Sequence, residues 1–434
     1  MTVAFATEPS IETDRPPSRI ASLAALALRP GSLGIFGQAT LSAANFLTGV
    51  ALGRACGDDC LGIYALAMSC VYIGIGVQTE LTSSPYHVYC VRRSGSALAR
   101  YTGSVLIHQT ISLLLLALAA AAILGSTGQL DRLRSVLLVF LWAGPLLVTR
   151  EFVRQMTFAR MEFRLAACLD VLAAAVQLGL IGTAWWLDRL SPSVALAAGG
   201  MAGASTYGVW MWRHRADIRL TPSLASLHWV RNFRFGRWTV ATYLVGSTLP
   251  FLMPWVLAAL HDEDAVGRLA ACNTLIGLSY MFTIGIANAL TGRVTRDYRE
   301  GGAAELMATL RRVAGIIAAV LVPFIVGVAV LGDWAIDFVF GFPGLGHVSL
   351  IIAVGVLAQG LSMVAGNGLW AIERPQDGFV ADALTLVVAI ALAAALVPSY
   401  AVVGAALATV GGQIVGMIVR WVALGRSLAA EGSR

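Results

Sequence analysis

The chain has 434 residues, of which 58% are hydrophobic and only 12% are charged. A soluble domain averages about 25% charged residues, so the composition excludes a protein whose whole surface faces water. The formal net charge of +6 comes from 30 basic residues, every one an arginine, against 24 acidic ones. Because the arginines lie in short gaps between apolar segments, we interpret the charge as membrane topology and expect no nucleic-acid partner.

Apolar segments of about 20 residues recur along the chain, and each is long enough to cross a bilayer core of roughly 30 Å as a helix. They predict an all-α integral membrane protein with twelve transmembrane helices in contact with the lipid bilayer. The expected helices are 33–53, 61–81, 102–125, 134–150, 165–187, 192–212, 238–260, 266–291, 313–332, 347–371, 379–397 and 400–423. Pro250 and Pro254 predict a kink in the seventh helix.

Arginine is distributed unevenly among the gaps. The two tails and the gaps after even-numbered helices hold 25 arginines. The gaps after odd-numbered helices hold five, namely Arg54, Arg132, Arg134, Arg189 and Arg268. The positive-inside bias then places both termini and the even gaps in the cytoplasm, and an even number of helices agrees with two arginine-bearing tails on one side.

The chain contains two related halves. Residues 52–65 align with residues 257–270 at an offset of 205, and Pro192-Ser193 aligns with Pro398-Ser399 at an offset of 206. Six helices is an even number, so two six-helix copies insert the same way up and are related by an axis along the membrane normal. The predicted domains are a disordered cytoplasmic tail at 1–30, an N-lobe at 31–212, a cytoplasmic linker at 213–237, a C-lobe at 238–425 and a cytoplasmic tail at 426–434.

Several segments carry a resemblance to a known transporter family. Residues 37–54 and 62–67 resemble the first two helices of Wzx-like polysaccharide-biosynthesis flippases, residues 150–160 resemble the segment between helices four and five, and residues 400–409 resemble the last helix. These flippases share a superfamily, called MOP, with MATE drug exporters and lipid II flippases. MATE exporters commonly carry an acid in the first helix and lipid II flippases have fourteen helices, so twelve helices without that acid favour the polysaccharide branch.

The resemblance implies a V-shaped pair of six-helix lobes around a central lumen. It implies a flippase of the bacterial inner membrane that moves a lipid-linked oligosaccharide, a polyprenyl-pyrophosphate glycan, from the inner to the outer leaflet for surface polysaccharide biosynthesis. Polysaccharide polymerases and glycosyltransferases are the partners that it suggests. Such a protein is not an enzyme and needs no cofactor or metal, although its transport can be coupled to a gradient of H+ or Na+.

Amide and hydroxyl side chains at membrane depth are candidates for a polar lumen. Polar groups in a bilayer are costly and usually face the bundle interior or a water-filled cavity, and an amide can both donate to and accept from sugar hydroxyls. The candidates are Gln38, Asn45, Gln78, Asn273, Tyr280, Asn288, Gln359 and Asn367. The alternative is that these side chains join helices through interhelical hydrogen bonds.

Charged residues near the cytoplasmic helix ends have two interpretations as well. Arg150, Arg154 and Arg160 could bind a pyrophosphate bidentately, or could anchor helices to anionic headgroups. Glu80, Asp170 and Asp382 are candidates for ion coupling, because desolvation allows a buried carboxylate to titrate near neutral pH. The alternative is that Asp170 and Asp382 lie near the interface, hydrated or paired with an arginine.

Two other functions remain open at this stage. A MATE-like, ion-coupled exporter of small molecules would use the same architecture. A membrane-embedded polymerase or acyltransferase is disfavoured, because the sequence offers neither a sizeable non-cytoplasmic loop nor a convergent set of His, Arg and acid. The six cysteines form no zinc pattern, although Cys56 and Cys60 share one short loop and could pair.

Overall fold

A computed structural model of the chain describes residues 30–126 and 131–432. The predicted tail at 1–30 lies outside these residues except for Pro30. The described residues form helices and connecting turns without a strand. The helices are α2 (Pro30–Cys56), α3 (Asp58–Gln78), α4 (Ser84–Cys90), α5 (Gly95–Ser126), α6 (Asp131–Ala159), α7 (Phe163–Trp186), α8 (Pro192–His214), α9 (Pro222–Gly246), α10 (Leu249–Leu260), α11 (Glu263–Gly277), α12 (Tyr280–Phe340), α13 (Gly346–Ala371) and α14 (Pro375–Gly432). A π-helical turn, η1 (Thr79–Ser83), joins α3 to α4, and a 3-10 turn, η2 (Arg215–Asp217), follows α8.

The helices agree with the predicted membrane class. Among the described residues, eight helices are long and apolar enough to cross a membrane, or nine if α9 and α10 form one bent span. Each of the twelve predicted ranges falls almost entirely on helix. Two long helices each contain one residue with non-helical backbone angles, Gly302 in α12 and Ala401 in α14.

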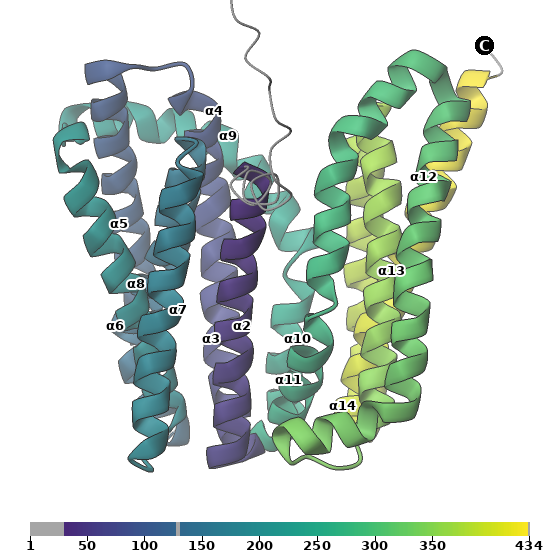
Figure 1. The fold of residues 1–434 in the computed structure, drawn as a ribbon, viewed down its shortest axis with the longest axis horizontal. Helices are drawn as coiled ribbons and strands as arrows, with labels where there is room; N and C mark the ends of the chain where they lie inside the picture. Colours follow the sequence, from purple (N-terminus) through teal and green to yellow (C-terminus); the bar gives the residue numbers. More distant parts are fainter. Residues whose placement is uncertain (1–29, 127–130, 433–434) are drawn as a thin grey trace, which may run out of the picture.

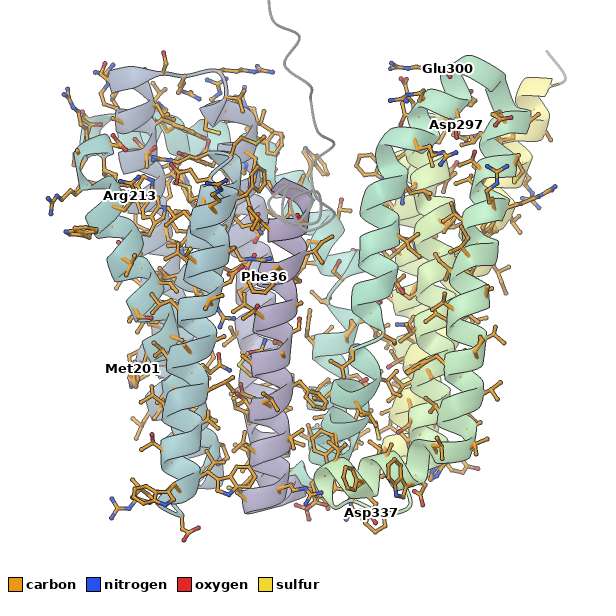
Figure 2. All side chains as sticks on the ribbon, in the orientation of Figure 1. Phe36, Met201, Arg213, Asp297, Glu300 and Asp337 are labelled. Carbon is orange, nitrogen blue, oxygen red and sulfur yellow. The ribbon has the colours of Figure 1, made fainter. Side chains whose placement is uncertain are left out.

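The helices form two bundles that meet at one end and diverge at the other (Figure 1). One bundle holds α2 to α8 and the other holds α11 to α14. The diverging end carries the arginine-rich gaps: Arg213 of one bundle and Glu300 of the other lie there, whereas Asp337 lies at the joined end (Figure 2). We call the two the arginine-rich end and the joined end.

The predicted linker at 213–237 is mostly helix. Residues 222–246 form α9, which packs on the first bundle: the Nε2 atom of His108 lies 2.8 Å from the carbonyl oxygen of Ala225, and the Tyr101 hydroxyl donates to Asn232 Oδ1 at 3.1 Å. Three arginines within its length lower the hydropathy of this segment, which is why the sequence suggested a loop.

The predicted kink in the seventh helix is confirmed. The axes of α9 and α10 differ by 52° across the break after Gly246, and Pro250 occupies the first turn of α10, where a missing backbone N–H costs nothing. Beyond the break, α10 packs against α14 of the second bundle and α3 of the first. The first helix of the other half, α2, runs unbroken from Pro30 to Cys56.

The joined end is held by residues of the internal repeat. Gly62 in α3 and Gly267 in α11 occupy matching positions of the two halves, and the two helices touch through their backbones there. A Cβ on Gly62 would collide with the carbonyl of Glu263, and a Cβ on Gly267 would collide with the carbonyl of Asp58. Only glycine permits this approach, so the repeat motif is the site at which the bundles make contact.

Two of the five arginines outside the tails and the arginine-rich gaps also bridge the bundles. Arg268 of the second bundle pairs with Asp58 of the first at 2.9 Å. Arg54 of the first bundle donates to the carbonyl of Val339 at 2.9 Å and to that of Phe338, at the end of α12. Their departure from the charge bias therefore coincides with a specific structural role.

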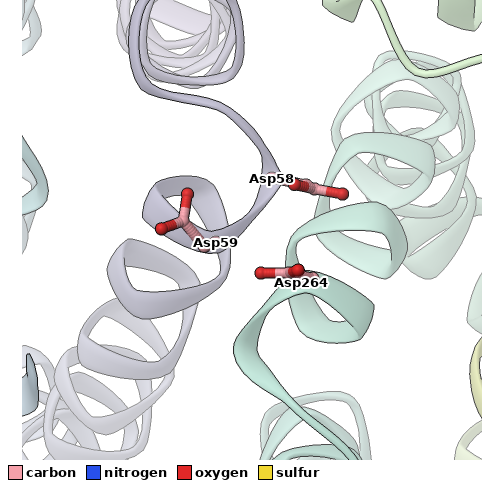
Figure 3. Close-up of side chains that lie close together, drawn as sticks. All are labelled: Asp58, Asp59 and Asp264. Atoms are coloured by element: carbon pink, nitrogen blue, oxygen red, sulfur yellow. The ribbon is translucent and has the colours of Figure 1, made fainter.

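Three carboxylates, those of Asp58, Asp59 and Asp264, converge beside this contact (Figure 3). Burial raises the pKa of Asp264, and the neighbouring charges of Asp58, Asp262 and Asp59 raise it further, against the opposing effect of Arg268. The joined end thus holds repelling charges as well as an attractive pair. Cys56 and Cys60 are both unpaired nearby, and the Cys56 thiol donates to the Leu190 carbonyl at 2.9 Å.

Candidate functional site between the two bundles

A cavity of about 340 Å3 lies between the two bundles, close to the joined end, and its largely apolar lining carries seven polar side chains. It is lined by α2 and α3 from one bundle and by α10 and α11 from the other. Of the predicted lumen residues, Asn45 and Asn273 contribute to it, one from each bundle. Its other polar side chains are Ser42, Tyr64, Ser69, Tyr72 and Thr274, and Phe46, Met68 and Phe251 are among the apolar ones. We call this space the central cavity.

A second cavity of about 400 Å3 continues from it into the second bundle. Both cavities are lined by Phe251 and Asn273, so they adjoin at the α10–α11 wall. Tyr280, a predicted lumen residue, lines the second cavity together with Thr409 and Gln413. Amide and hydroxyl groups of both bundles thereby line two adjoining cavities.

A chain of polar contacts links the central cavity to buried charges in the first bundle. The Gln177 amide donates to Asn45 Oδ1 at 3.3 Å and to the Thr48 hydroxyl at 3.0 Å. Its carbonyl oxygen accepts from Arg150 at 3.4 Å. The Nε atom of Arg150 is buried and has no hydrogen-bond partner among the described residues, so this guanidinium keeps donor capacity near the cavity.

Arg154 and Asp170 form the main ion pair of this bundle. Their side chains, 13% and 5% exposed, approach to 3.3 Å, and Arg154 also lies 3.6 Å from Glu151. Asp170 presses against α2 at Gly37, where a Cβ would collide with the carboxylate. Of the two predictions for Asp170, the geometry matches an acid paired with an arginine, and a role in coupling stays a prediction.

The second bundle repeats part of this arrangement. Asp382 pairs with Arg420 at 2.5 Å, and the same guanidinium donates to the Ser362 hydroxyl. The carboxylate of Asp382 lies against Gly246, where a Cβ would come within 3.0 Å. Gly246 is the residue at which α9 ends, so the ion pair touches the break in the seventh helix.

The remaining predicted residues lie apart from the two cavities. Gln38 is exposed and contacts Ser42 at 3.5 Å. The buried Gln78 donates to Ser83 at 2.9 Å, and Glu80 accepts from Ser84 at 3.4 Å, both at the η1 turn. Gln359 and Asn367 lie on α13 and line neither cavity, and the side chain of Asn288 is outside the described residues.

Arg160 is separated from Arg150 and Arg154. It donates to the Tyr86 and Thr102 hydroxyls at 3.2 Å each and lies 3.9 Å from Asp217. It lines a pocket of about 610 Å3 at the arginine-rich end of the first bundle. The three predicted phosphate-binding arginines therefore do not form one cluster.

Sequence reasoning missed five polar residues of the site. Tyr64, Ser69 and Tyr72 of α3 line the central cavity, and Thr409 and Gln413 of α14 line the second cavity. Spacings of three, four and eight residues are compatible with one helical face, but Tyr64 and Ser69, five residues apart, lie about 140° apart around the α3 axis. The side of α3 that lines the cavity could have been identified from the sequence only by knowing which side of this helix meets the other bundle.

The sequence model of the lipid II flippase MurJ family matches residues 136–434, which is well over half of the chain. The chain belongs to this family. No curated protein matches the sequence. The superfamily expected from the motifs is confirmed, while the assignment to its Wzx-like branch stays a prediction.

Solved structures of the MOP superfamily share the fold. A lipid II flippase MurJ in an inward closed conformation aligns with a TM-score of 0.73 at 14% identity, over 90% of this chain and 86% of that one. A multidrug resistance MATE family transporter in its inward-facing conformation gives 0.74 at 15% identity, over 90% of this chain and 95% of that one. The outward-facing form of a MATE family transporter gives 0.60 at 14% identity, over 92% and 94%. The matched family and these neighbours are transporters, which agrees with the prediction that this membrane protein is not an enzyme.

Proposed function

We propose that the protein is a flippase that carries a polyprenyl-pyrophosphate-linked glycan from the inner to the outer leaflet by alternating access. The observation that supports this most is the central cavity between the bundles, to which Asn45 and Asn273 contribute amides from opposite sides. Membership of a lipid flippase family supplies the substrate class, and amides and hydroxyls are the groups suited to a sugar head group.

The transport cycle follows from the shape of the molecule. We assign the arginine-rich end to the cytoplasm by the positive-inside bias, so the described form opens inward. The higher TM-score against an inward-facing transporter than against an outward-facing one, 0.74 against 0.60, supports this assignment. Dividing α12 at Gly302 and α14 at Ala401, and joining α3 to α4, α9 to α10 and α11 to the first part of α12, gives twelve spans in two six-helix lobes. This count includes α8, which is not one of the eight helices long and apolar enough to cross a membrane by themselves.

Arg150 is the residue that we assign to the pyrophosphate. Its unpartnered Nε lies in the polar chain that ends at Asn45 on the cavity. Arg154 is paired with Asp170 and Glu151. We therefore assign it a positioning role, in which it fixes the turn of α6 that carries Arg150. The guanidinium of Arg150 suits a phosphate because its planar fork can donate two hydrogen bonds at once.

The experiment is flipping of a fluorescent polyprenyl-pyrophosphate sugar in proteoliposomes that contain the full chain. Asn45→Leu and Asn273→Leu should each lower the rate roughly 5- to 150-fold, because each leaves a sugar hydroxyl without its partner at a cost of about 1–3 kcal/mol. Gln359→Leu is the matched control, an amide at membrane depth outside both cavities, and should transport normally. Unchanged flipping in both cavity variants contradicts the proposal.

A MATE-like small-molecule exporter is the second candidate. The observation in its favour is size: at about 340 and 400 Å3, each cavity lies in the range of drug-sized ligand sites. The same proteoliposomes distinguish the two functions. Gradient-driven uptake of cationic drugs without movement of the polyprenyl probe would favour the exporter.

A further inference from the structure

An apolar pocket of about 140 Å3 lies on the other side of α3 from the central cavity. It is enclosed by α3, α5 and α6 of the first bundle, and one wall is the ring of Trp255 from α10. Ala120 at its base is 5% exposed, whereas Trp255 is 38% exposed at its mouth. We call this space the lateral pocket.

A single helix wall separates the lateral pocket from the central cavity. Ile63 and Cys70 of α3 face the lateral pocket, and Tyr64 and Ser69, their chain neighbours, face the central cavity. The two spaces therefore lie at the same depth along α3, near the joined end. One carries polar side chains in its lining and lies between the bundles, and the other is apolar and lies at the outer wall of the first bundle.

One hydrogen bond across the bundles closes the seam between these spaces. The indole N–H of Trp255 donates to the Ser69 hydroxyl at 2.7 Å, and the same hydroxyl donates to the Leu66 carbonyl at 2.7 Å. Trp255 belongs to α10, which packs against α14 of the second bundle as well as against α3 of the first, whereas Ser69 is buried in the first bundle. When the bundles separate at the joined end and α10 moves with α14, the indole is pulled away from Ser69, and the seam beside the lateral pocket opens.

We propose that the lateral pocket holds an isoprene unit of the transported lipid's polyprenyl chain, and that Trp255 is the lateral gate through which this chain leaves the central cavity. The inference rests on the flippase function proposed above and names the site of the substrate's apolar part. A polyprenyl-linked substrate needs adjoining polar and apolar sites, and these two spaces adjoin at Ser69 and Trp255.

The dimensions of the pocket suit one branched unit. A dry cavity of about 150 Å3 lined by apolar side chains is large enough for a benzene ring, so the lateral pocket has room for the five carbons of an isoprene. Its walls offer almost no polar surface, which excludes a head group. Moving a polyprenyl chain from the lipid into this pocket brings no hydrophobic gain, because the lipid tails are as apolar as the pocket. Selection of the chain therefore depends on packing contacts.

Photocrosslinking tests occupancy directly. A benzophenone amino acid replaces Ala119, which lines the lateral pocket, or its neighbour Leu118 on α5, which does not; both residues are exposed, so the two positions differ in the pocket and not in access to lipid. In nanodiscs, a long-chain polyprenyl pyrophosphate should crosslink at least about threefold more from position 119, as expected for a site that depends on packing contacts. Equal yields at the two positions, or equal crosslinking of phospholipid acyl chains at position 119, would show that the pocket holds ordinary annular lipid and overturn the proposal.

Transport with two chain lengths tests the role of the pocket. Ala120→Phe fills it, and Ala121→Phe places the same ring on an exposed neighbour. Flipping of the long-chain probe should fall about fivefold in Ala120→Phe alone, as expected when one unit loses its packing contacts. A two-isoprene probe with the same head group should move normally. Equal slowing of both probes, or equal rates in both variants, would reject the chain site.

The two failures remain distinguishable. If the unaltered protein moves neither probe, the flippase function fails, and the ratio of crosslinking at positions 119 and 118 still decides whether a polyprenyl chain occupies the pocket. If both probes move but position 119 shows no excess, the flippase stands and the lateral pocket is not its chain site.

Discussion

The two bundles carry an aspartate at the same place, buried in the first and partly buried in the second, with different arginine partners. Asp170 and Asp382 sit at equivalent places of the two halves, each against a glycine of its half's first helix, Gly37 and Gly246. The arginine partners differ. Arg154 comes from α6, the helix before the one that carries Asp170. Arg420 comes from the part of α14 beyond Ala401, whereas Asp382 lies in the part before it. The repeat thus preserves the acid and the close helix contact, and each bundle supplies its own counter-charge.

The difference in partners separates two roles. In the first bundle, Arg150 and Gln177 continue the polar chain from the ion pair region to the central cavity. In the second, the pair ends at Ser362 and touches Gly246, where the seventh helix breaks. The first arrangement suits contact with a substrate, and the second suits control of a bend.

Removing the arginine partner should therefore reduce the stability of the protein more in the second bundle than in the first. Arg420→Met removes the only ion-pair partner that Asp382 has among the described residues. Breaking a buried pair in this way costs about 3–5 kcal/mol, so folded protein in the membrane should fall sharply. Arg154→Met should cost less, because Arg150 remains near Asp170. The measurement is the fraction of monodisperse protein and its thermal midpoint in detergent.

The double variant Arg420→Met, Asp382→Asn is the control. It removes the unpaired charge and should recover much of the stability. Equal losses in Arg154→Met and Arg420→Met would mean that the difference between the two bundles has no energetic consequence.

Much of this comparison was accessible from the sequence. The acid positions, the repeat offset and the apolar segments depend on residue identity along one chain, and charge and hydropathy report them directly. The arginine partners were not accessible, because Arg420 reaches Asp382 across 38 residues and Arg154 reaches Asp170 across 16. Helix packing decides which arginine turns inward, and the sequence offered pairing of Asp170 and Asp382 with an arginine only as an alternative, without identifying the partner.

The candidate site was only partly predictable for a similar reason. Asn45 and Asn273 stand out as amides in apolar helices, and both line the central cavity. Gln38 and Gln359 stand out equally and line neither cavity. An amide is visible in a sequence, but the direction of its helix face is set by contacts with the other bundle. The fold class therefore follows from local composition, whereas the site depends on long-range packing.

The glycine contact tests whether the two bundles are equivalent at the joined end. Gly62→Ala and Gly267→Ala each insert a methyl group against the backbone of the opposite bundle, at a cost of about 1–3 kcal/mol as for an overpacked core. Both should shift the population toward the form that is open at this end. Spin labels at Arg189 and His347, exposed at that end on opposite bundles, would report the distance change.

Gly182→Ala is the matched control, because a Cβ at that position meets nothing within 4 Å. It should leave the distance distribution as it is. If Gly62→Ala shifts the distribution and Gly267→Ala does not, the reciprocal contact between the repeats is asymmetric and the equivalence drawn from their offset fails.

The smallest expected effect is the pH response of the joined end. Asp264 has a raised pKa while the bundles are in contact, through burial first and then through the charges of Asp58, Asp262 and Asp59, against Arg268. Separation exposes Asp264 and removes Asp58 and Asp59, so its pKa returns toward the usual value. The joined form then binds more protons, and it is favoured as the pH falls through the raised pKa.

This response should be about twofold in the ratio of joined to separated forms, as for like charges at a hydrated site. Asp264→Asn removes the charge, so it should favour the joined form at neutral pH and abolish the response. Asp337→Asn makes the same change in net charge at the same end (Figure 2), at a residue that is not one of the three converging carboxylates, and should keep the response. The spin-label distance between positions 189 and 347, measured from pH 4 to pH 8, is the readout. If the ratio instead rises with pH in the unaltered protein, the attraction between Arg268 and Asp58, rather than the repulsion around Asp264, governs this end.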